Sequence, residues 1–185
     1  TLPDPPLLAA AAAGELDGPE GIAAQARRLI DDPRSEALIR DFAAQWLGIE
    51  ALERLDRSPE LDFDPALKGA MLEETRAFVG HVVHRGTHRY AELLTADYTL
   101  GGAELAEHYA LDQPRPPPGE HPGEPSEIQY RAGRRAGLLG HGSVLSATSH
   151  SDQTSPIRRG LFVRRALLCQ PLPPPPPTAG GVPEV

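Results

Sequence analysis

The residues best suited to chemistry lie in the polar segment 148–160. It begins as a loop rich in serine and threonine with a single histidine, His150, and continues through a Ser-Pro pair into a helix that opens with Arg158 and Arg159. A histidine held on a loop can ligate an iron, and arginines at a helix start can pair with the carboxylates of a cofactor. We therefore take His150, Arg158 and Arg159 as candidate cofactor-binding residues and His150 as the candidate metal ligand. The alternative is that His150 and the hydroxyl groups of this segment only cap the helix.

Three further histidines, His81, His84 and His88, follow one another at spacings of three and four residues. Imidazoles at such spacing share one face of a helix and can bind the same metal ion. Gly86 interrupts that face before His88, and no carboxylate stands at an intervening helical position to complete a ligand set. We therefore expect histidines near a helix C-terminus, where the helix dipole favours them, and no metal site.

Two adjacent glutamates, Glu73 and Glu74, lie in the longest stretch with helical periodicity. Neighbouring positions on a helix are about 100° apart, so these carboxylates do not face each other as a general acid and base would need. We expect both on a solvated face, paired with arginines such as Arg76. The enzymatic alternative places them in a cleft together with Asp97.

Motifs of known catalytic classes are missing from the sequence. No glycine-rich phosphate loop, dinucleotide-binding turn or nucleophile elbow occurs. Serines between positions 143 and 151 stand near His141 and His150, but Asp152 is the one acid close enough in sequence to orient a histidine. The residues alone identify no reaction.

The composition fits one globular domain or two small ones. The 185 residues are 39% hydrophobic and 24% charged, with 21 prolines and 18 glycines that gather in a few stretches. No run approaches the roughly 18 apolar residues that a bilayer-spanning helix needs. The single cysteine, Cys169, cannot close an internal disulfide, and we expect it to be a small buried residue because it follows Ala-Leu-Leu.

Charge is distributed unevenly along the chain. Residues 1–130 hold 24 acidic and 11 basic residues, whereas residues 131–185 hold two acids and seven arginines. We expect the basic segment to pack on or beside the acidic helical part. Nucleic acid is disfavoured as a partner, because the larger part of the chain would repel phosphates.

Helical periodicity organises the first half of the chain. The predicted helices span residues 7–13, 19–31, 35–47 and 64–86. The third has apolar pairs every four residues, among them Leu38 and Phe42, and includes the only tryptophan, Trp46, which we expect to pack in the core. Asp64 stands at an N-cap position before a proline, and Gly48 stands where a helix ends.

The second half alternates short helices with irregular segments. We expect short helices around 93–94 and 103–109, a mildly apolar segment at 144–150 and a helix over 156–169. That last helix has apolar residues on all sides and should be largely enclosed. The proline-rich stretch 113–125 should be an extended loop, and the run Pro173–Pro177 should form polyproline II.

These elements predict an all-α fold, an irregular helical bundle with long connections rich in proline and glycine. No alternating run of more than about four residues indicates a strand. We divide the chain into a helical domain (1–112), a proline-rich connection (113–130) and an arginine-rich segment (131–185) that ends in the polyproline run.

Several separated segments resemble one family. The sequence TSPIRRGLFV at 154–163, with the following proline run, resembles the C-terminal cytochrome-like domain of large secreted proteins, first recognised in planctomycetes and common in myxobacteria. The sequences ARRLIDDPR at 26–34, FAAQWL at 42–47 and LTADYT at 94–99 resemble the helical domain of unknown function that precedes it. The matching motifs keep the family's order and extend over nearly the whole chain.

The resemblance implies an internal fragment of a larger periplasmic or secreted protein. In that family a Cys-x-x-Cys-His motif for haem c follows the proline run, and these 185 residues do not contain it. The resemblance therefore implies haem c attached outside this chain. The implied function is a helical module that packs beside the haem domain of its own polypeptide in association with electron transfer. Its partner is the remainder of that polypeptide, with no nucleic acid and no membrane span.

Two alternatives remain open at this point. One is a secreted polymer-degrading or redox enzyme module that uses Glu73, Glu74 and Asp97 and has the haem domain as redox partner. The other is a structural docking module whose proline-rich segments, 114–125 and 171–177, bind a partner's groove. The sequence does not decide between an enzyme and a non-catalytic module.

Overall fold

The computed structural model describes residues 2–55, 63–112, 125–171 and residue 173. Within these ranges the protein is mainly helical, which confirms the predicted fold class, and one two-stranded sheet accompanies the helices. In chain order the elements are α1 (Pro5–Ala12), η1 (Glu15–Asp17), α2 (Pro19–Ile30), α3 (Ser35–Leu47), η2 (Ile49–Arg54), α4 (Pro65–His84), α5 (Tyr90–Thr95), β1 (Tyr98–Gly101), α6 (Ala103–His108), β2 (Ser126–Gln129), η3 (Leu138–Gly140), α7 (Gly142–Ala147), α8 (Pro156–Phe162) and η4 (Val163–Leu167).

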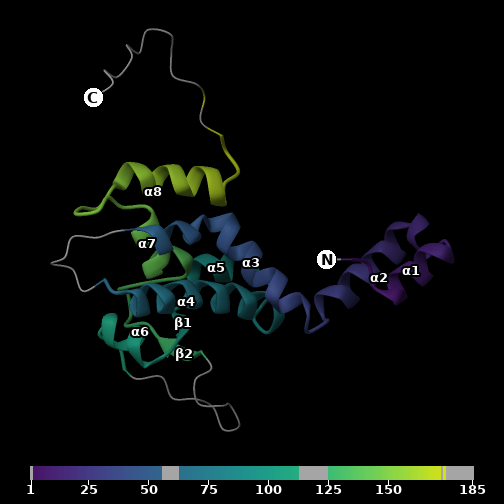
Figure 1. Cartoon of the computed structure of the whole chain (residues 1–185), viewed down its shortest axis with the longest axis horizontal. Coiled ribbons are helices and arrows are strands. Elements are labelled where there is room, and N and C mark those ends of the chain that lie inside the picture. Colours follow the sequence, from purple (N-terminus) through teal and green to yellow (C-terminus); the bar gives the residue numbers. More distant parts are fainter. Residues whose placement is uncertain (1, 56–62, 113–124, 172, 174–185) are drawn as a thin grey trace.

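Helix α4 runs through the centre of the body (Figure 1). It begins as predicted, because the Asp64 side chain accepts the Leu67 N–H at 2.8 Å and Pro65 occupies the first helical position. Helices α3, α6 and α7, strand β1 and the short helix η2 all contact it. The buried core therefore gathers on α4, where Phe78 has no exposed surface.

Strands β1 and β2 form an antiparallel pair in which Thr99 lies opposite Ile128. The pair is not predicted from the sequence, because a four-residue strand is too short to display a clear alternation. Burial does alternate along β2, with Ser126 and Ile128 buried and the residues between and after them exposed. Strand β2 falls in the segment predicted as a proline-rich connection, so residues on both sides of the proline-rich stretch meet in one sheet.

Helices α1 and α2 form an arm at one end of the molecule, apart from the body (Figure 1). Both match predicted helices. The Asp4 side chain caps α1 by accepting the Leu7 N–H. Its two oxygens also accept hydrogen bonds from the two terminal nitrogens of Arg28, at 2.8 and 2.9 Å. The hydrogen bonds from Arg28 lower the pKa of the Asp4 carboxyl. This contact joins the start of α1 to the end of α2.

Helix α3 has the predicted span but turns a different face to the core. Ala43 and Ala44 have no exposed surface, whereas Leu38 and Phe42 are 54% and 55% exposed. Helix α3 contacts α4 with Ala43 and Ala44 in the core, and two residues of the predicted apolar stripe, Leu38 and Phe42, lie outside. Gly48 ends the helix in the left-handed conformation, as predicted.

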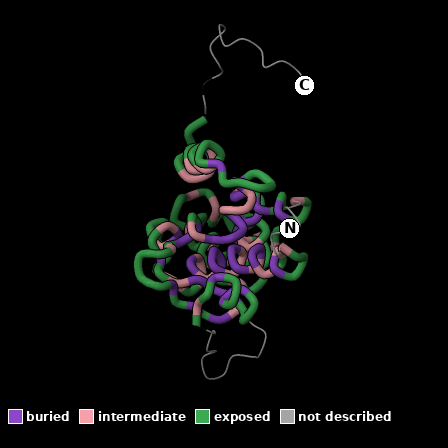
Figure 2. The backbone as a smooth tube through the Cα atoms, turned by 90° about the vertical axis from the view of Figure 1, so that its left-hand side faces the viewer, coloured by how far each residue is buried: buried purple, intermediate pink, exposed green. Residues whose placement is uncertain are grey.

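The predicted enclosure of the helix over 156–169 is wrong. Helix α8 begins at the expected signal, where the Ser155 hydroxyl accepts the Arg158 N–H at 3.3 Å. No residue of α8 or η4 is buried, however, and Ile157 is 78% exposed. In Figure 2 these residues lie at the upper edge of the body, coloured as exposed or intermediate. Apolar residues on every side of a helix therefore do not mean burial within this chain.

Two side-chain hydrogen bonds attach η4, a π-helical turn, to the body. The Trp46 indole N–H donates to the Ala166 carbonyl at 2.8 Å, and the Tyr90 hydroxyl donates to the Leu167 carbonyl at 3.0 Å. The predicted attraction between the basic segment 131–185 and the acidic part of the chain forms no ion pair at this contact. In the described ranges no arginine of 131–171 lies within ion-pair distance of a carboxylate, and the arginine ion pairs all fall within residues 4–73.

Cys169 is exposed, so the prediction of a buried residue is wrong. It follows η4 directly and has a backbone φ of +51°, in the left-handed region that often ends a helix. This conformation turns the chain away from the helix, and the cysteine side chain turns with it into solvent.

The extended loop predicted at 113–125 and the polyproline run predicted at 173–177 lie almost entirely outside the described residues. No helix in the described ranges combines the length and the apolar composition that crossing a membrane requires. The division into segments 1–112, 113–130 and 131–185 stays a prediction.

Candidate functional site

The loop that carries His150 is tied to the start of α8. The His150 backbone N–H donates to the Gln153 carbonyl at 2.9 Å, and Arg158 Nη1 donates to the Ser149 carbonyl at 2.9 Å. The His150 and Arg158 residues are both exposed. The structure thus holds the loop against the helix start and presents both candidate residues on the surface.

Arg159, the third candidate, is partly buried and lines two cavities of about 430 and 210 Å³. Asp152 and His108 line the first cavity with it, and Phe162 lines the second. The Arg159 Nε atom is buried and has no hydrogen-bond partner among the described residues. Because buried donors are rarely left unpaired, this nitrogen is suited to bind an acceptor from outside the chain.

The three candidates do not line a common cavity. Arg159 lines the two cavities above, whereas His150 and Arg158 line neither of them. In the described ranges no group of three histidine, cysteine or acidic side chains is placed to hold a metal ion. The roles of His150, Arg158 and Arg159 therefore stay predictions.

The histidines near the end of α4 separate into two groups. His81 and His84 line a cavity of about 510 Å³ together with Arg40 and Arg85. His88 lies beyond the helix end, with its Nδ1 2.8 Å from the Val83 carbonyl oxygen. Glu36 and Glu127 also line this cavity, so charges of both signs surround the imidazoles, and no metal-binding group of three forms here among the described residues.

Glu74, predicted on a solvated face, is fully buried. Its carboxylate accepts hydrogen bonds from the hydroxyl groups of Thr99 at 2.9 Å, Tyr109 at 2.7 Å and Tyr130 at 3.3 Å. These donors come from β1, from the end of α6 and from the residue after β2. Three segments that follow α4 in the chain therefore meet at one carboxylate on α4.

A second set of polar contacts adjoins this carboxylate. Thr75 Oγ1 lies 2.8 Å from His141 Nδ1 and 2.7 Å from Ser143 Oγ. The Tyr109 hydroxyl, which donates to Glu74, accepts the Gly142 N–H at 2.6 Å. A Cβ at position 142 would lie 2.8 Å from that hydroxyl oxygen, so the contact requires glycine. We call these residues, Glu74, Thr75, Thr99, Tyr109, Tyr130, His141, Gly142 and Ser143, the buried polar network.

Burial sets the protonation behaviour of the network. It raises the pKa of Tyr109 and Tyr130, and the neighbouring Glu74 carboxylate raises both further, because a phenolate there would be buried beside a negative charge. Burial lowers the pKa of His141, whose ring packs edge-on against Phe78. The tyrosines therefore remain hydroxyl donors, and the imidazole favours its neutral form.

The network joins segments and is closed to substrates. Glu74, Thr75, His141 and Ser143 have no exposed surface, so a ligand in solution cannot reach them. Hydrogen bonds in such an interior are strong and depend on one another. The arrangement is suited to fix α4, the sheet and α7 relative to one another.

The three carboxylates of the enzymatic alternative do not share a cleft. Glu73 pairs with Arg40, at the boundary between α3 and α4, and not with Arg76 as predicted. Glu74 points into the interior, and Asp97 is exposed. A general acid and base pair is therefore not assembled from these residues.

The buried role of Glu74 has a signal in the sequence. Its spacing from Leu67, Met71 and Phe78 places it on the same face of the helix as these three buried residues. An acid on an apolar face indicates a buried polar contact. The three hydroxyl donors to Glu74, which are Thr99, Tyr109 and Tyr130, lie 25, 35 and 56 positions away in sequence, and no local pattern marks them.

Comparison with known proteins yields two family matches. A model described as PSD4, protein of unknown function (DUF1592), matches residues 1–111, and one described as PSCyt3, protein of unknown function (DUF1588), matches residues 135–185. No curated protein and no solved structure matches the chain. The buried polar network takes Glu74 and Tyr109 from the first matched range and His141 and Ser143 from the second. The two matched ranges thus contribute to one core.

Proposed function

Because the chain belongs to the PSD4 family of proteins of unknown function (DUF1592), within the planctomycete cytochrome-like group, we propose that it is a helical module that packs beside a haem-bearing part of its own polypeptide. The observation that carries this proposal is the surface of α8 and η4. We define this α8 surface by its apolar and basic residues, which are Ile157, Arg158, Arg159, Arg164, Arg165 and Leu168; Arg159 is partly buried and the other five are exposed.

The α8 surface has the composition of an interface. Ile157 and Leu168 are 78% and 55% exposed, although both are large apolar residues. In the described part of the chain, no carboxylate lies within ion-pair distance of its arginines. Exposed apolar groups next to unneutralised guanidinium groups fit a partner with an apolar body and negative groups at its edge. A haem and the protein around it have these properties, because the ring is apolar and the propionates are anionic.

The residues fit a neighbour of the haem and not its covalent host. Thioether attachment of haem c takes two cysteines, and this sequence has one, which is exposed. The buried, unpartnered Nε of Arg159 suits a propionate oxygen, and we assign the same role to Arg158. His150, on its exposed loop, is assigned to the iron side or the edge of the haem. When bound, the haem supplies one-electron transfer.

We also propose a cellular compartment for the full polypeptide. A haem attached through thioethers is assembled outside the cytoplasm, so we place the full polypeptide in the periplasm or among secreted proteins. In this arrangement the arm formed by α1 and α2 and the body around α4 act as a scaffold that presents the α8 surface.

Hydrogen exchange tests the interface. We expect the amides of 157–168 to exchange at least about tenfold more slowly in the full-length, haem-loaded protein than in the 185-residue chain, because a partner covers them. The double variant Ile157→Asp and Arg159→Glu should abolish this protection. Arg27→Glu, an exposed change on the distant arm, is the matched control. Equal exchange in the two wild-type proteins would contradict the proposal.

Spectroscopy tests the individual residues. In the full-length protein, His150→Ala should change the absorption spectrum of the haem if this imidazole ligates the iron. Arg159→Gln should shift the haem reduction potential, because it removes a positive charge near a propionate. A spectrum identical to that of the wild type removes the ligand role of His150, and an unchanged potential removes the propionate role of Arg159.

A further inference from the structure

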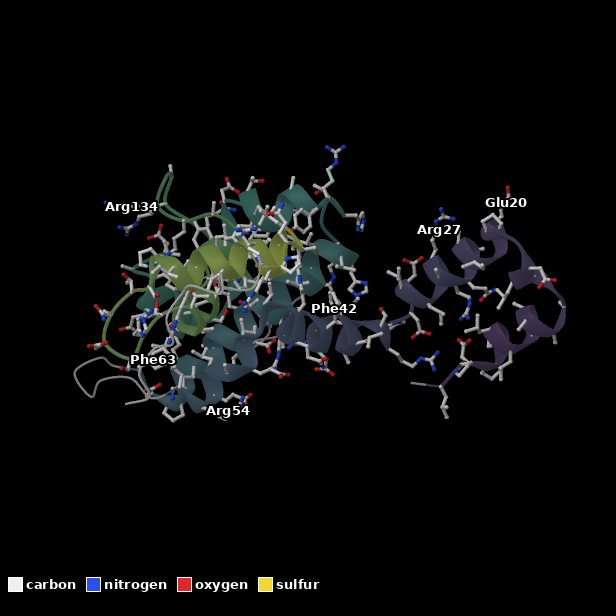
Figure 3. All side chains as sticks on the ribbon, turned by 90° about the horizontal axis from the view of Figure 1, so that it is seen from above. Glu20, Arg27, Phe42, Arg54, Phe63 and Arg134 are labelled. Carbon is white, nitrogen blue, oxygen red and sulfur yellow. The ribbon has the colours of Figure 1, made fainter. Side chains whose placement is uncertain are left out.

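A second basic region lines a cleft of about 570 Å³, which adjoins the cavities of Arg159 through the shared residues Leu139 and Leu145. Its walls include Arg131, Arg134 and Arg135 and the two tyrosines Tyr109 and Tyr130. Figure 3 labels Arg134, which lies at the edge of the body opposite the arm. This volume falls within the range of pockets that hold small organic molecules. None of the residues assigned to the haem neighbour lines this cleft, so the inference is independent of the proposed function.

The loop that carries the arginines is held in one place by its backbone. The Arg134 N–H donates to the Arg131 carbonyl at 3.1 Å and closes a turn. Gly137 has a φ of +46°, and its N–H donates to the Ala96 carbonyl at 2.9 Å. A Cβ at position 137 would lie 2.3 Å from the Leu93 carbonyl oxygen, so glycine is required for the loop to lie on α5.

The wall of the cleft is also fixed before any ligand arrives. The Arg135 guanidinium stacks on the Tyr109 ring, 4.0 Å from its centroid, and Nη1 donates to the Gly140 carbonyl at 2.5 Å. The hydroxyl groups of Tyr109 and Tyr130 donate to Glu74 in the interior, which orients both rings. A wall that is ordered in advance reduces the entropy cost of binding.

The cleft is positively charged. In the ranges that the structure describes, none of its three arginines lies within ion-pair distance of a carboxylate. Planar guanidinium groups match carboxylate and phosphate oxygens. The two tyrosines form the buried floor of the cleft, and Leu111, Leu139 and Leu145 in its lining, of which Leu139 is 41% exposed, offer apolar contact. We propose that this cleft binds an organic anion in which a carboxylate or phosphate group is attached to an apolar body.

Calorimetric titration of the 185-residue chain tests this site with four probes. Isophthalate and phenyl phosphate combine a ring with an anionic group, isophthalamide has the ring without the charge, and inorganic phosphate has the charge without the ring. We expect at least one of the first two to bind, with lower affinity at high salt, and the tighter one identifies the anionic group. The absence of binding by both would overturn the proposal, as would equally tight binding of isophthalamide or inorganic phosphate.

Variants locate the binding in this cleft. The double change Arg131→Gln and Arg134→Gln should weaken binding of the tighter probe by about tenfold or more, because both residues are exposed and supply charge. Arg27→Gln, on α2 at the other end of the molecule (Figure 3), should leave the affinity unchanged. An equal loss in both variants, or no loss in the double variant, would show that the probe binds elsewhere. Circular dichroism melts check that each variant remains folded.

Discussion

A single carboxylate, that of Glu74, connects the centre of the protein. It accepts hydrogen bonds from the hydroxyl groups of Thr99, Tyr109 and Tyr130, each on a different segment. Such an arrangement stabilises a fold strongly only while all members are present, because each orphaned hydroxyl in the interior costs about 1–3 kcal/mol. Glu74 therefore matters more to the fold than Glu73, the partly exposed acid beside it.

The variant Glu74→Gln should lower the free energy of unfolding by about 2 kcal/mol. Its amide N–H₂ group replaces an acceptor and faces hydroxyl groups that need one. Urea unfolding followed by circular dichroism measures the change. The control Glu73→Gln removes an ion pair with Arg40 between partly exposed side chains and should cost less than about 1 kcal/mol. Equal losses in the two variants would contradict a special role for Glu74.

His141 should make the stability depend on pH. Above the ordinary imidazole pKa of about 6.5 the folded and unfolded chains are both neutral at this residue. Below it the unfolded chain takes up a proton that the buried ring, with its lowered pKa, resists, so the free energy of unfolding falls as the pH decreases.

Unfolding by urea at about pH 7.5 and about pH 5 measures this dependence. We expect the wild type to lose about 1 kcal/mol or more over this interval. His141→Gln cannot be protonated there and should lose less, although His108, whose pKa is also lowered, mainly by burial, retains part of the effect. A pH dependence as steep in the variant as in the wild type would exclude His141 as its source.

At the scale of elements, the C-terminal helix is attached at few points. Trp46 and Tyr90 donate to successive carbonyls of the π-helical turn η4, and the helix has no buried residue. Elements with few buried contacts open more easily than the core. Helix α8 with η4 is thus the part of the body best placed to adjust to a partner.

Replacing both donors should release this element. In the double variant Trp46→Phe and Tyr90→Phe, we expect amide exchange of residues 163–168 to be about tenfold faster, because two hydrogen bonds are lost. Mass spectrometry of exchanged peptides measures the rate, and peptides of α4 should show no change. Phe42→Leu, which alters a ring stacked on Trp46 without removing a donor, is the control. Unchanged exchange in the double variant would show that other contacts hold η4.

At the scale of the whole molecule, the two family-matched ranges form one structural unit. Strand β1 lies in the first range, and β2, which pairs with it, lies just before the second. The buried polar network crosses the same boundary from Thr75 to His141 and Ser143. Neither range contains all members of the network.

Cleavage between the two ranges should leave them associated. If a protease site is inserted within 113–124 and cut, we expect the two pieces to migrate together in size-exclusion chromatography, since the sheet and the network connect them without the peptide bond. Addition of urea should then separate them. Two independent peaks after cleavage under native conditions would contradict a shared core.

Local signals in the sequence predicted α1 to α6 and α8 in their order, but α7 (Gly142–Ala147) only as a mildly apolar segment. The pairs Asp64-Pro65 and Ser155-Pro156 and the position of Gly48 define helix ends, because capping depends on residues within a single turn. Periodicity gave the spans of α2, α3 and α4 and the all-α class. The basic C-terminal segment and the family resemblance were also visible, since both are properties of the residues in order.

Only the tertiary structure decided which residues meet. The contacts of Glu74 with Thr99 and of Thr75 with His141 join residues 25 and 66 positions apart, and no local pattern specifies such a pair. The same holds for the exposure of α8 and for the pairing of β2, because periodicity shows that a face is apolar but not what covers it. Burial depends on the neighbours that the folded chain brings, and for that reason Glu74 turned inward while Ile157 and Cys169 turned outward.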